Sequence, residues 1–310
     1  MVELADVRAA AERIRGLVHR TPVMTSATVD GDLGASVFFK CENMQKVGAF
    51  KARGACNAVM ALDEESARRG VTAHSSGNHA AALAYAAARR GIPCVVVMPD
   101  SAPQVKVDAV RGYGAEIVFC PQGEREAACE RVQRERGAVL IHPFENPYVI
   151  AGQGTAVLEL LDIVGDLDVV LVPVGGGGLC AGTALTVKAL RPATQVIAAE
   201  PDAVDDAARS MASGERQPTV ANPRTIADGL MTGLGEPNFA IMRDHDVRVV
   251  TVSEDEIVAA GRFFLERMKI VVEPSAATVL AAMGRIAREL SGRRVGVVLS
   301  GGNTDFRWLV

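Results

Sequence analysis

Short apolar runs alternate with longer segments of helical periodicity along most of the 310-residue chain. Many runs are apolar at every position rather than at alternate positions, which is typical of parallel strands buried on both faces. This alternation predicts an α/β fold with mostly parallel, twisted sheets flanked by helices. The predicted strands are Ser36–Lys40, Cys94–Met98, Glu116–Phe119, Val169–Val174, Gln195–Ala199, Val247–Val252 and Arg294–Leu299, and the predicted helices are His79–Arg90, Glu124–Arg136, Thr155–Ile163, Ala181–Leu190, Glu254–Met268 and Ala276–Leu290.

The length corresponds to two domains at roughly 150 residues each. A proline-containing segment at residues 142–147 is the best candidate for a crossing between two lobes, and a second crossing is predicted near residues 63–69. These crossings predict a large domain of residues 1–62 plus 148–310 and a small domain of residues 63–147.

Charge and composition exclude several classes of partner. The chain has 33 Lys and Arg residues against 37 Asp and Glu residues, a net charge of −4. This balance argues against nucleic-acid binding and against an anionic membrane surface. No 18 apolar residues run together, so no membrane span is expected. The six cysteines form no C-x-x-C pair, which indicates reduced core thiols in a cytoplasmic protein.

Four consecutive glycines, Gly175 to Gly178, lie between the apolar run Val169–Val174 and a predicted helix. Their backbone N–H groups can form an anion nest beside the positive end of the helix, so we expect a phosphate-binding loop rather than a flexible linker. The pattern Gly176-x-Gly178-x-x-Ala181 also fits a relaxed dinucleotide fingerprint, and Glu200 ends the next predicted strand. A nicotinamide-dependent oxidoreductase therefore remains an alternative at this point.

Two further loops and one lysine suggest a ligand site. The segment Ser75–His79 opens a predicted helix whose N-terminus could bind a carboxylate or could simply be capped by a side chain. A second loop, residues 300–303, follows a predicted parallel strand, at the end where ligands bind in such sheets. Lys51 lies among small residues, where desolvation would favour its use as a nucleophile or base; a solvated lysine at a helix start is the alternative.

Taken together, these motifs resemble a known family. Over nearly its whole length the chain is similar to the pyridoxal-phosphate enzymes of fold type II, in particular the serine/threonine dehydratase and serine racemase group. The matching segments, in order, are Glu42-Asn43-x-Gln45, Phe50-Lys51-x-Arg53-Gly54-Ala55, Ser75-Ser76-Gly77-Asn78-His79, Ile150-Ala151-Gly152-Gln153-Gly154-Thr155, Pro173-Val174-Gly175-Gly176-Gly177-Gly178, Ala227-Asp228-Gly229, Glu273-Pro274-Ser275 and Ser300-Gly301-Gly302-Asn303. The resemblance implies two domains and displaces the dinucleotide interpretation, which explains neither Lys51 nor the Ser-Gly-Asn-His loop.

The resemblance also implies roles for individual residues. Lys51 would hold pyridoxal phosphate as a Schiff base and would later act as the base at the substrate Cα. The other implied cofactor-binding residues are Phe50, Asn78 at the ring hydroxyl, Gly175, Gly176, Gly177 and Gly178 at the phosphate, Gly229, Glu273, and Ser300 at the pyridine nitrogen. The implied substrate-binding residues are Ser75, Ser76, Asn78 and His79.

The chemistry implied by these roles is loss of a β-hydroxyl group. A hydroxyl partner such as Ser300 gives the pyridine nitrogen little help in staying protonated, which favours elimination. L-Serine would give pyruvate and L-threonine would give 2-oxobutanoate, each with ammonia. In the racemase branch the residue matching Ser76 returns a proton on the face opposite the lysine, so racemisation is an alternative activity. A cofactor-binding protein that has lost catalysis is a third possibility, which the intact Lys51, Ser76 and Asn78 argue against.

The resemblance extends to two further groups of residues. It aligns Arg131 with an arginine that can reach a second substrate carboxylate, which would allow L-threo-3-hydroxyaspartate; the alternative is an ion pair with Glu135. It also places Mg²⁺ or Ca²⁺ at Glu200, Val204 and Asp206, where the alternative is a pair of acids near a helix start. The family usually forms homodimers. A departure at Ala80-Ala81, where relatives often have Gly or Ala followed by Gln, affects the predicted substrate pocket.

Overall fold

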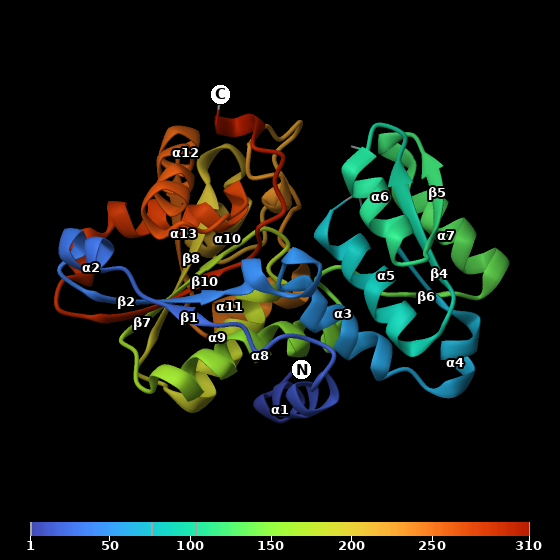
Figure 1. Ribbon diagram of the computed structural model, residues 1–310, viewed down its shortest axis with the longest axis horizontal. Coiled ribbons are helices and arrows are strands. Elements are labelled where there is room, and N and C mark those ends of the chain that lie inside the picture. Colours follow the sequence, from blue (N-terminus) through green and yellow to red (C-terminus); the bar gives the residue numbers. More distant parts are fainter. Residues whose placement is uncertain (1, 76, 103, 310) are drawn as a thin grey trace.

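The chain folds into two α/β lobes, each built around one sheet (Figure 1). The computed structural model describes residues 2–75, 77–102 and 104–309. The larger sheet has the strand order β1-β2-β10-β7-β8-β9 and is parallel except for the β1–β2 pair, and the smaller sheet, β5-β4-β3-β6, is parallel throughout. The strands are β1 (Val23–Met24), β2 (Ser36–Cys41), β3 (Val71–His74), β4 (Cys94–Pro99), β5 (Glu116–Cys120), β6 (Val139–Leu140), β7 (Val169–Pro173), β8 (Gln195–Pro201), β9 (Arg248–Val252) and β10 (Arg294–Leu299).

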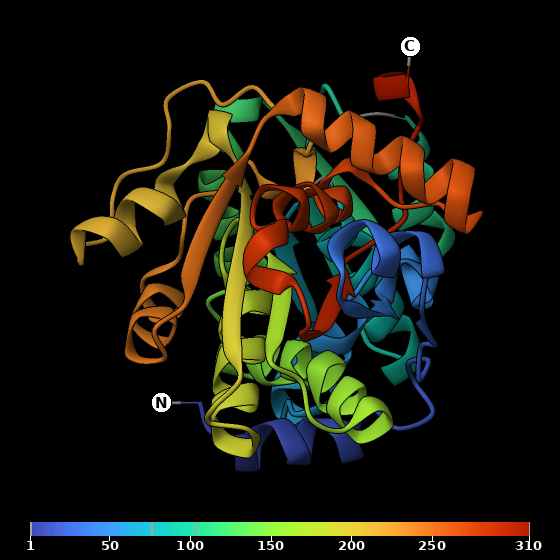
Figure 2. The ribbon, with the colours of Figure 1, turned by 90° about the vertical axis from the view of Figure 1, so that its left-hand side faces the viewer.

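Helices cover both faces of the larger sheet, as Figure 2 shows from the side of that lobe. Helices α8 and α9 pack on one face and α13 packs on the other, while α5 and α7 pack on the smaller sheet and α3 lies between the lobes (Figure 1). The helices are α1 (Leu4–Arg13), α2 (Ala27–Leu33), α3 (Lys51–Met60), α4 (Glu64–Arg69), α5 (Asn78–Arg90), α6 (Gln104–Gly112), α7 (Arg125–Arg136), α8 (Pro147–Val164), α9 (Gly178–Leu190), α10 (Asp206–Ser213), α11 (Glu236–Asp244), α12 (Glu254–Phe263), α13 (Pro274–Arg285) and α14 (Ala287–Leu290).

The predicted fold class is confirmed, and all seven predicted strands are present. The sequence pattern missed β1, β3 and β6, which are only two to four residues long. The helix predicted from Thr155 begins at Pro147 instead, because the side chain of Asn146 accepts hydrogen bonds from the N–H groups of Tyr148 and Val149. The strands of the smaller sheet all lie between residues 71 and 140, within the range predicted for a small domain.

Helix α8 is the central helix of the larger lobe. By length and composition alone it could cross a membrane, with a mean hydropathy of 1.2 over 18 residues, but 61% of that stretch is buried inside the fold. It packs between α3 and α9. A Cβ at Gly152 would lie 2.6 Å from the Cα of Gly54 in α3, and one at Gly154 would lie 2.9 Å from the carbonyl oxygen of Gly182 in α9. Glycine is therefore required where the three helix backbones meet.

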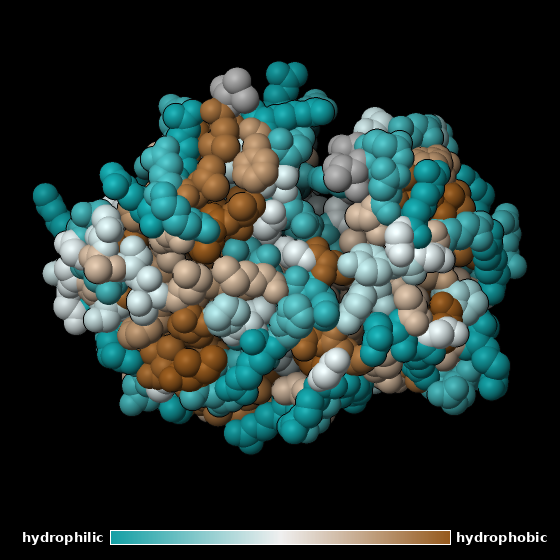
Figure 3. All heavy atoms as spheres, in the orientation of Figure 1, coloured by the Kyte–Doolittle hydropathy of each residue, from teal (hydrophilic) through white to brown (hydrophobic). Residues whose placement is uncertain are grey.

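Most of the molecular surface seen from one side is hydrophilic. Figure 3 shows hydrophilic side chains over much of this face, with separate hydrophobic patches, the larger of them on the lobe that carries the six-stranded sheet. All six cysteines are buried and free, as the composition predicted.

Candidate active site

Lys51 is the first residue of α3, the helix that lies between the two lobes (Figure 1). Its Nζ atom donates a hydrogen bond to the carbonyl oxygen of Pro143 (2.9 Å) and lies 5.1 Å from the centre of the Phe50 ring. Burial lowers the pKa of Lys51 to about 8, against an opposing effect of the Glu273 carboxyl group. At neutral pH about a tenth of the side chain is therefore the free amine, the form that acts as nucleophile or base.

The four glycines form a turn between β7 and α9 that has no room for side chains. All four are buried. A Cβ at Gly175 would lie 2.9 Å from the Cα of Leu230, and one at Gly176 would lie 2.4 Å from the Phe144 ring. Gly177 has a φ of +87°, a conformation that L side chains rarely adopt. The turn leads into the N-terminus of α9, where the first N–H groups of a helix have no intrahelical acceptor, as a phosphate-binding loop requires.

Other segments hold this loop in place. The N–H of Gly176 donates to Thr232 Oγ1 (3.0 Å). The side-chain amide of Asn238, from α11, donates to the carbonyl oxygens of both Gly176 (2.6 Å) and Phe144 (2.9 Å). Phe144 follows Pro143, whose carbonyl accepts the Lys51 hydrogen bond. The lysine and the glycine loop thus share one supporting segment.

Asn78 of the smaller lobe is hydrogen-bonded to the larger lobe. Its Nδ2 donates to both carboxyl oxygens of Glu273 (3.0 Å each), and its Oδ1 accepts a hydrogen bond from Asn303 (2.9 Å). Burial raises the pKa of Glu273 to about 7, whereas the hydrogen bond from Asn78 lowers it. Glu273 can therefore hold or release a proton near neutral pH.

The N-terminus of α5 faces the same region. The first N–H groups of a helix, here those of Asn78 and His79, have no intrahelical acceptor and can bind a carboxylate. The side chain of His79 is engaged elsewhere, because its Nε2 donates to the Ile141 carbonyl (2.8 Å). Burial lowers the pKa of His79 to about 3, so its ring stays neutral. Only the backbone of His79 is thus suited to substrate binding, while Ser75 Oγ accepts from the N–H of Gly77 (3.3 Å), and Ser76 lies outside the described residues.

Ser300 and Gly229 lie on the large-lobe side. Ser300 is buried at the end of β10. Its carbonyl oxygen accepts a hydrogen bond from the N–H of Phe50 (2.9 Å), the residue that precedes Lys51. The N–H of Gly229 donates to Ser275 Oγ (3.1 Å), and Ser275 lies two residues after Glu273. The structure therefore brings Phe50, Lys51, Asn78, Glu273 and Ser300 into one connected site.

The side of the site formed by the smaller lobe, which we call the small-lobe wall, contains cationic and aromatic residues that the sequence analysis missed. The rings of His74 and His142 are 6.1 Å apart, and His142 contacts Phe144 edge to face. Burial lowers the pKa of His74; the nearby Glu126 carboxylate opposes this effect, and the positive charge of Arg125 adds to it. Arg125 precedes the buried residues Ala128, Cys129 and Val132 at helical spacing. This spacing places Arg125 on the inward-facing side of α7 and could have identified it from the sequence.

The structure does not place Arg131 at this wall. Arg131 is exposed on α7, since it lies off the stripe formed by Ala128, Cys129 and Val132. The predicted ion pair with Glu135 is absent from the ion pairs of the described residues, and the ion pair on this part of the helix joins Arg134 to Glu130.

The residues predicted to bind a metal lie together at the end of β8. Glu200 and Asp206 are buried, and their carboxylates accept hydrogen bonds from the N–H groups of Ala207, Ala208 and Leu234. Burial raises the pKa of Glu200 to about 8 and raises that of Asp206. Within the described part of the chain no group of three His, Cys, Asp or Glu side chains could hold a metal. Any cation here would depend on these two carboxylates and on backbone oxygens such as that of Val204.

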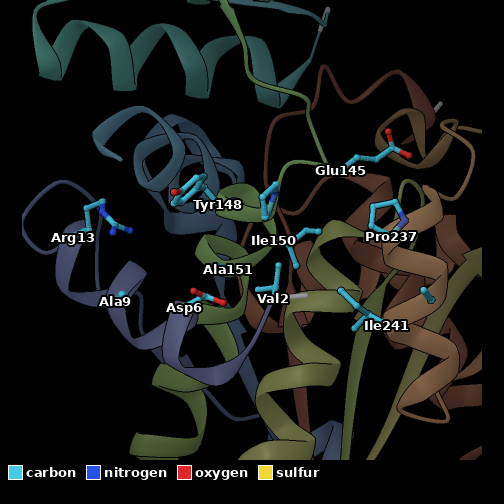
Figure 4. A pocket seen from close by; sticks show the side chains of 12 residues that line it. Val2, Asp6, Ala9, Arg13, Glu145, Tyr148, Ile150, Ala151, Pro237 and Ile241 are labelled. Atoms are coloured by element: carbon cyan, nitrogen blue, oxygen red, sulfur yellow. The ribbon is translucent and has the colours of Figure 1, made fainter. Parts of the chain in front are cut away.

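A separate cavity of about 570 Å³ lies on the outside of the larger lobe. Figure 4 shows Asp6 and Arg13 of α1 on one side of it and Pro237 and Ile241 of α11 on the other. None of the predicted catalytic or cofactor-binding residues lines it, so this cavity is not the active site.

Comparisons with known proteins agree with this geometry. Residues 14–301 match the family model described as pyridoxal-phosphate dependent enzyme. The chain is 48% identical over 311 residues to a serine racemase from Dictyostelium discoideum (98% of this chain, 95% of the relative), and 48% identical over 302 residues to a beta-hydroxyaspartate dehydratase from Paracoccus denitrificans (97% and 96%). The crystal structure of a threonine deaminase from T.th. superposes with a TM-score of 0.93 at 46% identity, covering 98% of this chain and 99% of that one. The chain therefore belongs to the family of pyridoxal-phosphate dependent enzymes, with the fold of the fold-type II group.

Proposed function

We propose that the protein is an ammonia-lyase that dehydrates a β-hydroxy-α-amino acid to a 2-oxo acid, and that it prefers a substrate with a second carboxylate, L-threo-3-hydroxyaspartate. The observation that carries the reaction type is the Lys51 amine, whose pKa is lowered to about 8 between a phosphate-binding loop and a carboxylate-binding helix N-terminus. The same geometry disfavours a cofactor-binding protein without activity, because nothing in such a role requires an activated lysine.

The residues present fit pyridoxal phosphate. The side-chain-free turn of Gly175 to Gly178 leaves backbone N–H groups at the N-terminus of α9 for a phosphate. Lys51 supplies an amine for covalent attachment to an aldehyde, and the hydroxyl of buried Ser300 suits a pyridine nitrogen. When bound, the cofactor would accept the electron pair left at the substrate Cα after proton loss.

The protein's own groups then have defined tasks. The N–H groups of Asn78 and His79 bind the α-carboxylate, and Lys51, as the free amine, takes the proton from Cα. The hydroxyl group leaves Cβ as the Cα–Cβ double bond forms, and it departs as water with the proton that Lys51 took from Cα. The resulting enamine tautomerises and reacts with water, which gives the 2-oxo acid and ammonia. Pro143, as acceptor of the Lys51 hydrogen bond, holds Nζ in place through these proton transfers.

The preference for a second carboxylate follows from charge. On the small-lobe wall, Arg125 and the Glu126 carboxylate both lie near His74, and the ring of His142 is 6.1 Å from that of His74, so Arg125 is the positively charged donor available there for a carboxylate. An arginine fork binds a carboxylate in a bidentate manner. Relatives with 45–48% identity include, besides the Paracoccus dehydratase, L-threo-3-hydroxyaspartate ammonia-lyases from Saccharomyces cerevisiae and a Pseudomonas species.

Racemisation of serine is the second candidate activity. It is supported by serine racemases among the relatives, at 44–48% identity. It requires a second proton donor on the face opposite Lys51, the role predicted for Ser76. A Ser76→Ala variant should lose racemisation and keep elimination from the L-substrate, and equal loss of both would contradict a division of labour between two faces.

The substrate is tested by adding L-serine, L-threonine and L-threo-3-hydroxyaspartate separately and measuring 2-oxo acid release and D-serine formation. We expect the highest kcat/KM with L-threo-3-hydroxyaspartate. An Arg125→Gln variant should lose about tenfold to a hundredfold in kcat/KM for that substrate, in line with about 1.5–3 kcal/mol for a charged hydrogen bond, and little for L-serine. The matched control Arg131→Gln, on the same helix, should change neither. Equal effects of the two variants would refute the assignment of Arg125.

We also propose that Glu200, Asp206 and the Val204 carbonyl bind Mg²⁺ or Ca²⁺. Two buried carboxylates without an ion-pair partner among the described residues suit a hard cation with oxygen ligands. Millimolar Ca²⁺ should raise the melting temperature of the wild type but not that of an Asp206→Asn variant; an equal rise in both would exclude this site.

A further inference from the structure

A cluster of four charged side chains lies beneath the helix that carries Lys51. Arg53 and Lys40 provide two positive charges, and Glu42 and Glu159 provide two negative charges. Arg53, Lys40 and Glu42 are fully buried, and the Glu159 side chain is 17% exposed. The four residues come from β2, the turn that follows it, α3 and α8. We call them the buried charge cluster.

Arg53 is the centre of this cluster. Its Nε and one terminal nitrogen donate to the two Glu42 oxygens (2.7 and 2.8 Å), and its two terminal nitrogens donate to the two Glu159 oxygens (2.8 and 2.9 Å). Further bonds reach Thr155 Oγ1 (3.1 Å) and the His19 carbonyl (3.3 Å). The guanidinium is therefore held on two sides by carboxylates in fork geometry, which permits one orientation.

Further contacts hold the two glutamates of the cluster in place. Glu42 is held by the Thr21 hydroxyl (2.6 Å) and Glu159 is shared with the Lys40 ammonium. On the same flank, the backbones of Gly54 and Gly152 meet without space for a side chain. Because Arg53 lies two residues after Lys51 in the same helix, any rotation or slide of α3 breaks these bonds and also moves Nζ.

Stability alone does not explain four buried charges. Buried ion pairs often give no more stability than apolar residues of the same volume, because desolvation offsets their attraction. The distinctive property of buried ion pairs is geometric, because their hydrogen bonds form in only one arrangement of the side chains.

From this arrangement we infer that Arg53 is a positioning residue for the proposed reaction: its double fork to Glu42 and Glu159 sets the axial rotation of α3 and thereby the position of Lys51 Nζ. Arg53 touches neither substrate nor cofactor in this role, and it acts through Lys51. The inference rests on the proposed function only in taking Lys51 as the reacting amine.

An Arg53→Lys variant tests the inference, because it keeps the net charge of the cluster and removes the fork. Displacing a catalytic group by about 1 Å can cost a hundredfold in rate, so we expect kcat to fall about tenfold to a hundredfold with KM changed by less than about threefold. Arg285→Lys is the matched control. Arg285 also pairs with a glutamate of a neighbouring helix, Glu256, and it lies beside α2, on the side of the larger lobe away from α3 (Figure 1). The control should retain the wild-type kcat.

A second readout needs no substrate. Trace acetylation of the full-length protein without cofactor, followed by mass spectrometry, gives the pH at which Lys51 is half-reactive. We expect a value near 8 for the wild type, the pKa to which burial lowers this lysine, and a higher value for Arg53→Lys, because a displaced lysine is better solvated. If the wild type turned over none of the tested amino acids, the proposed function would fail, while this readout would still decide the role of Arg53.

The result that overturns the inference is an Arg53→Lys protein with a lower melting temperature but unchanged Lys51 reactivity and unchanged kcat. Should that variant not fold, Glu42→Gln/Arg53→Met takes its place, because it leaves Lys40 paired with Glu159 and the cluster neutral. Failure of both variants to fold would also overturn the inference, since the cluster would then be required for folding itself.

Discussion

Replacing Gly152 by alanine tests whether the close contact between α3 and α8 is needed. The new Cβ would lie 2.6 Å from the Cα of Gly54, 2.8 Å from the carbonyl oxygen of Arg53 and 2.9 Å from the N atom of Gly54. All three are backbone atoms, so no side-chain rotation can relieve the contact, and α3 must move by roughly 0.8 Å to restore ordinary spacing. Overpacking of this kind costs about 1–3 kcal/mol, of which alanine's better helix propensity returns up to about 1 kcal/mol.

The matched control is Gly284→Ala in α13. This glycine is also helical, but a Cβ there meets nothing within 4 Å. The control should gain about 0.5–1 kcal/mol. Thermal unfolding followed by circular dichroism should show a melting temperature lowered by several degrees for Gly152→Ala and slightly raised for Gly284→Ala, at about 2 °C per kcal/mol for a chain of this size. A Gly152→Ala protein as stable as the control would refute the reasoning. Because α3 carries Lys51, kcat should fall for Gly152→Ala only.

Two further predictions concern charged groups at the junction of the lobes. The folded state raises the pKa of Glu273 to about 7, so its stabilising contribution is present below about pH 4.5 and is lost as the pH rises through 7. Glu273→Gln should therefore gain stability over the wild type between about pH 5 and pH 8, by up to about 3 kcal/mol; calorimetry showing a pH-independent difference would contradict this. Lys106 of α6 in the smaller lobe pairs with Asp228 of the larger lobe, with side chains 32% and 47% exposed. Lys106→Ala should cost less than about 1 kcal/mol, and a larger loss in urea unfolding would mean that this pair holds the lobes together.

The larger elements of the fold could be predicted because their signals are local. The strands β4, β7 and β10 are continuous apolar runs, and such runs need no tertiary information to be recognised. In contrast, β6 consists of Val139 and Leu140 alone and exists only because β3 pairs with it. Helix α3 is absent from the predicted helices, since its sequence carries Gly54 and two buried polar side chains, Arg53 and Asn57, whose partners lie far away in the chain.

The site was predictable to the extent that it consists of sequence motifs. The glycine loop and Lys51 lie where the motifs indicated, and the structure adds a second reason for glycine in that loop. The sequence suggested an open anion nest, whereas the structure shows that Phe144 and Leu230 also press against the loop and leave no room for a Cβ. Arg131 was chosen from its alignment on α7, while Arg125, about one and two-thirds turns earlier, lies on the stripe that faces the sheet. Which arginine faces inward depends on how α7 packs, which the sequence does not state.

The glycine contacts along α3, α8 and α9 have a consequence for engineering this protein. Gly54 meets Gly152, and Gly154 meets Gly182, so two close backbone contacts link the helix that begins at Lys51, through α8, to the helix that begins at Gly178. Neither contact can accept a larger side chain without moving the helices apart, and hence without changing the span between the lysine amine and the glycine loop. Redesign for a new amino acid should leave these three helices untouched and vary side chains of the small lobe instead, such as His74 at the end of β3 and Arg125 at the start of α7.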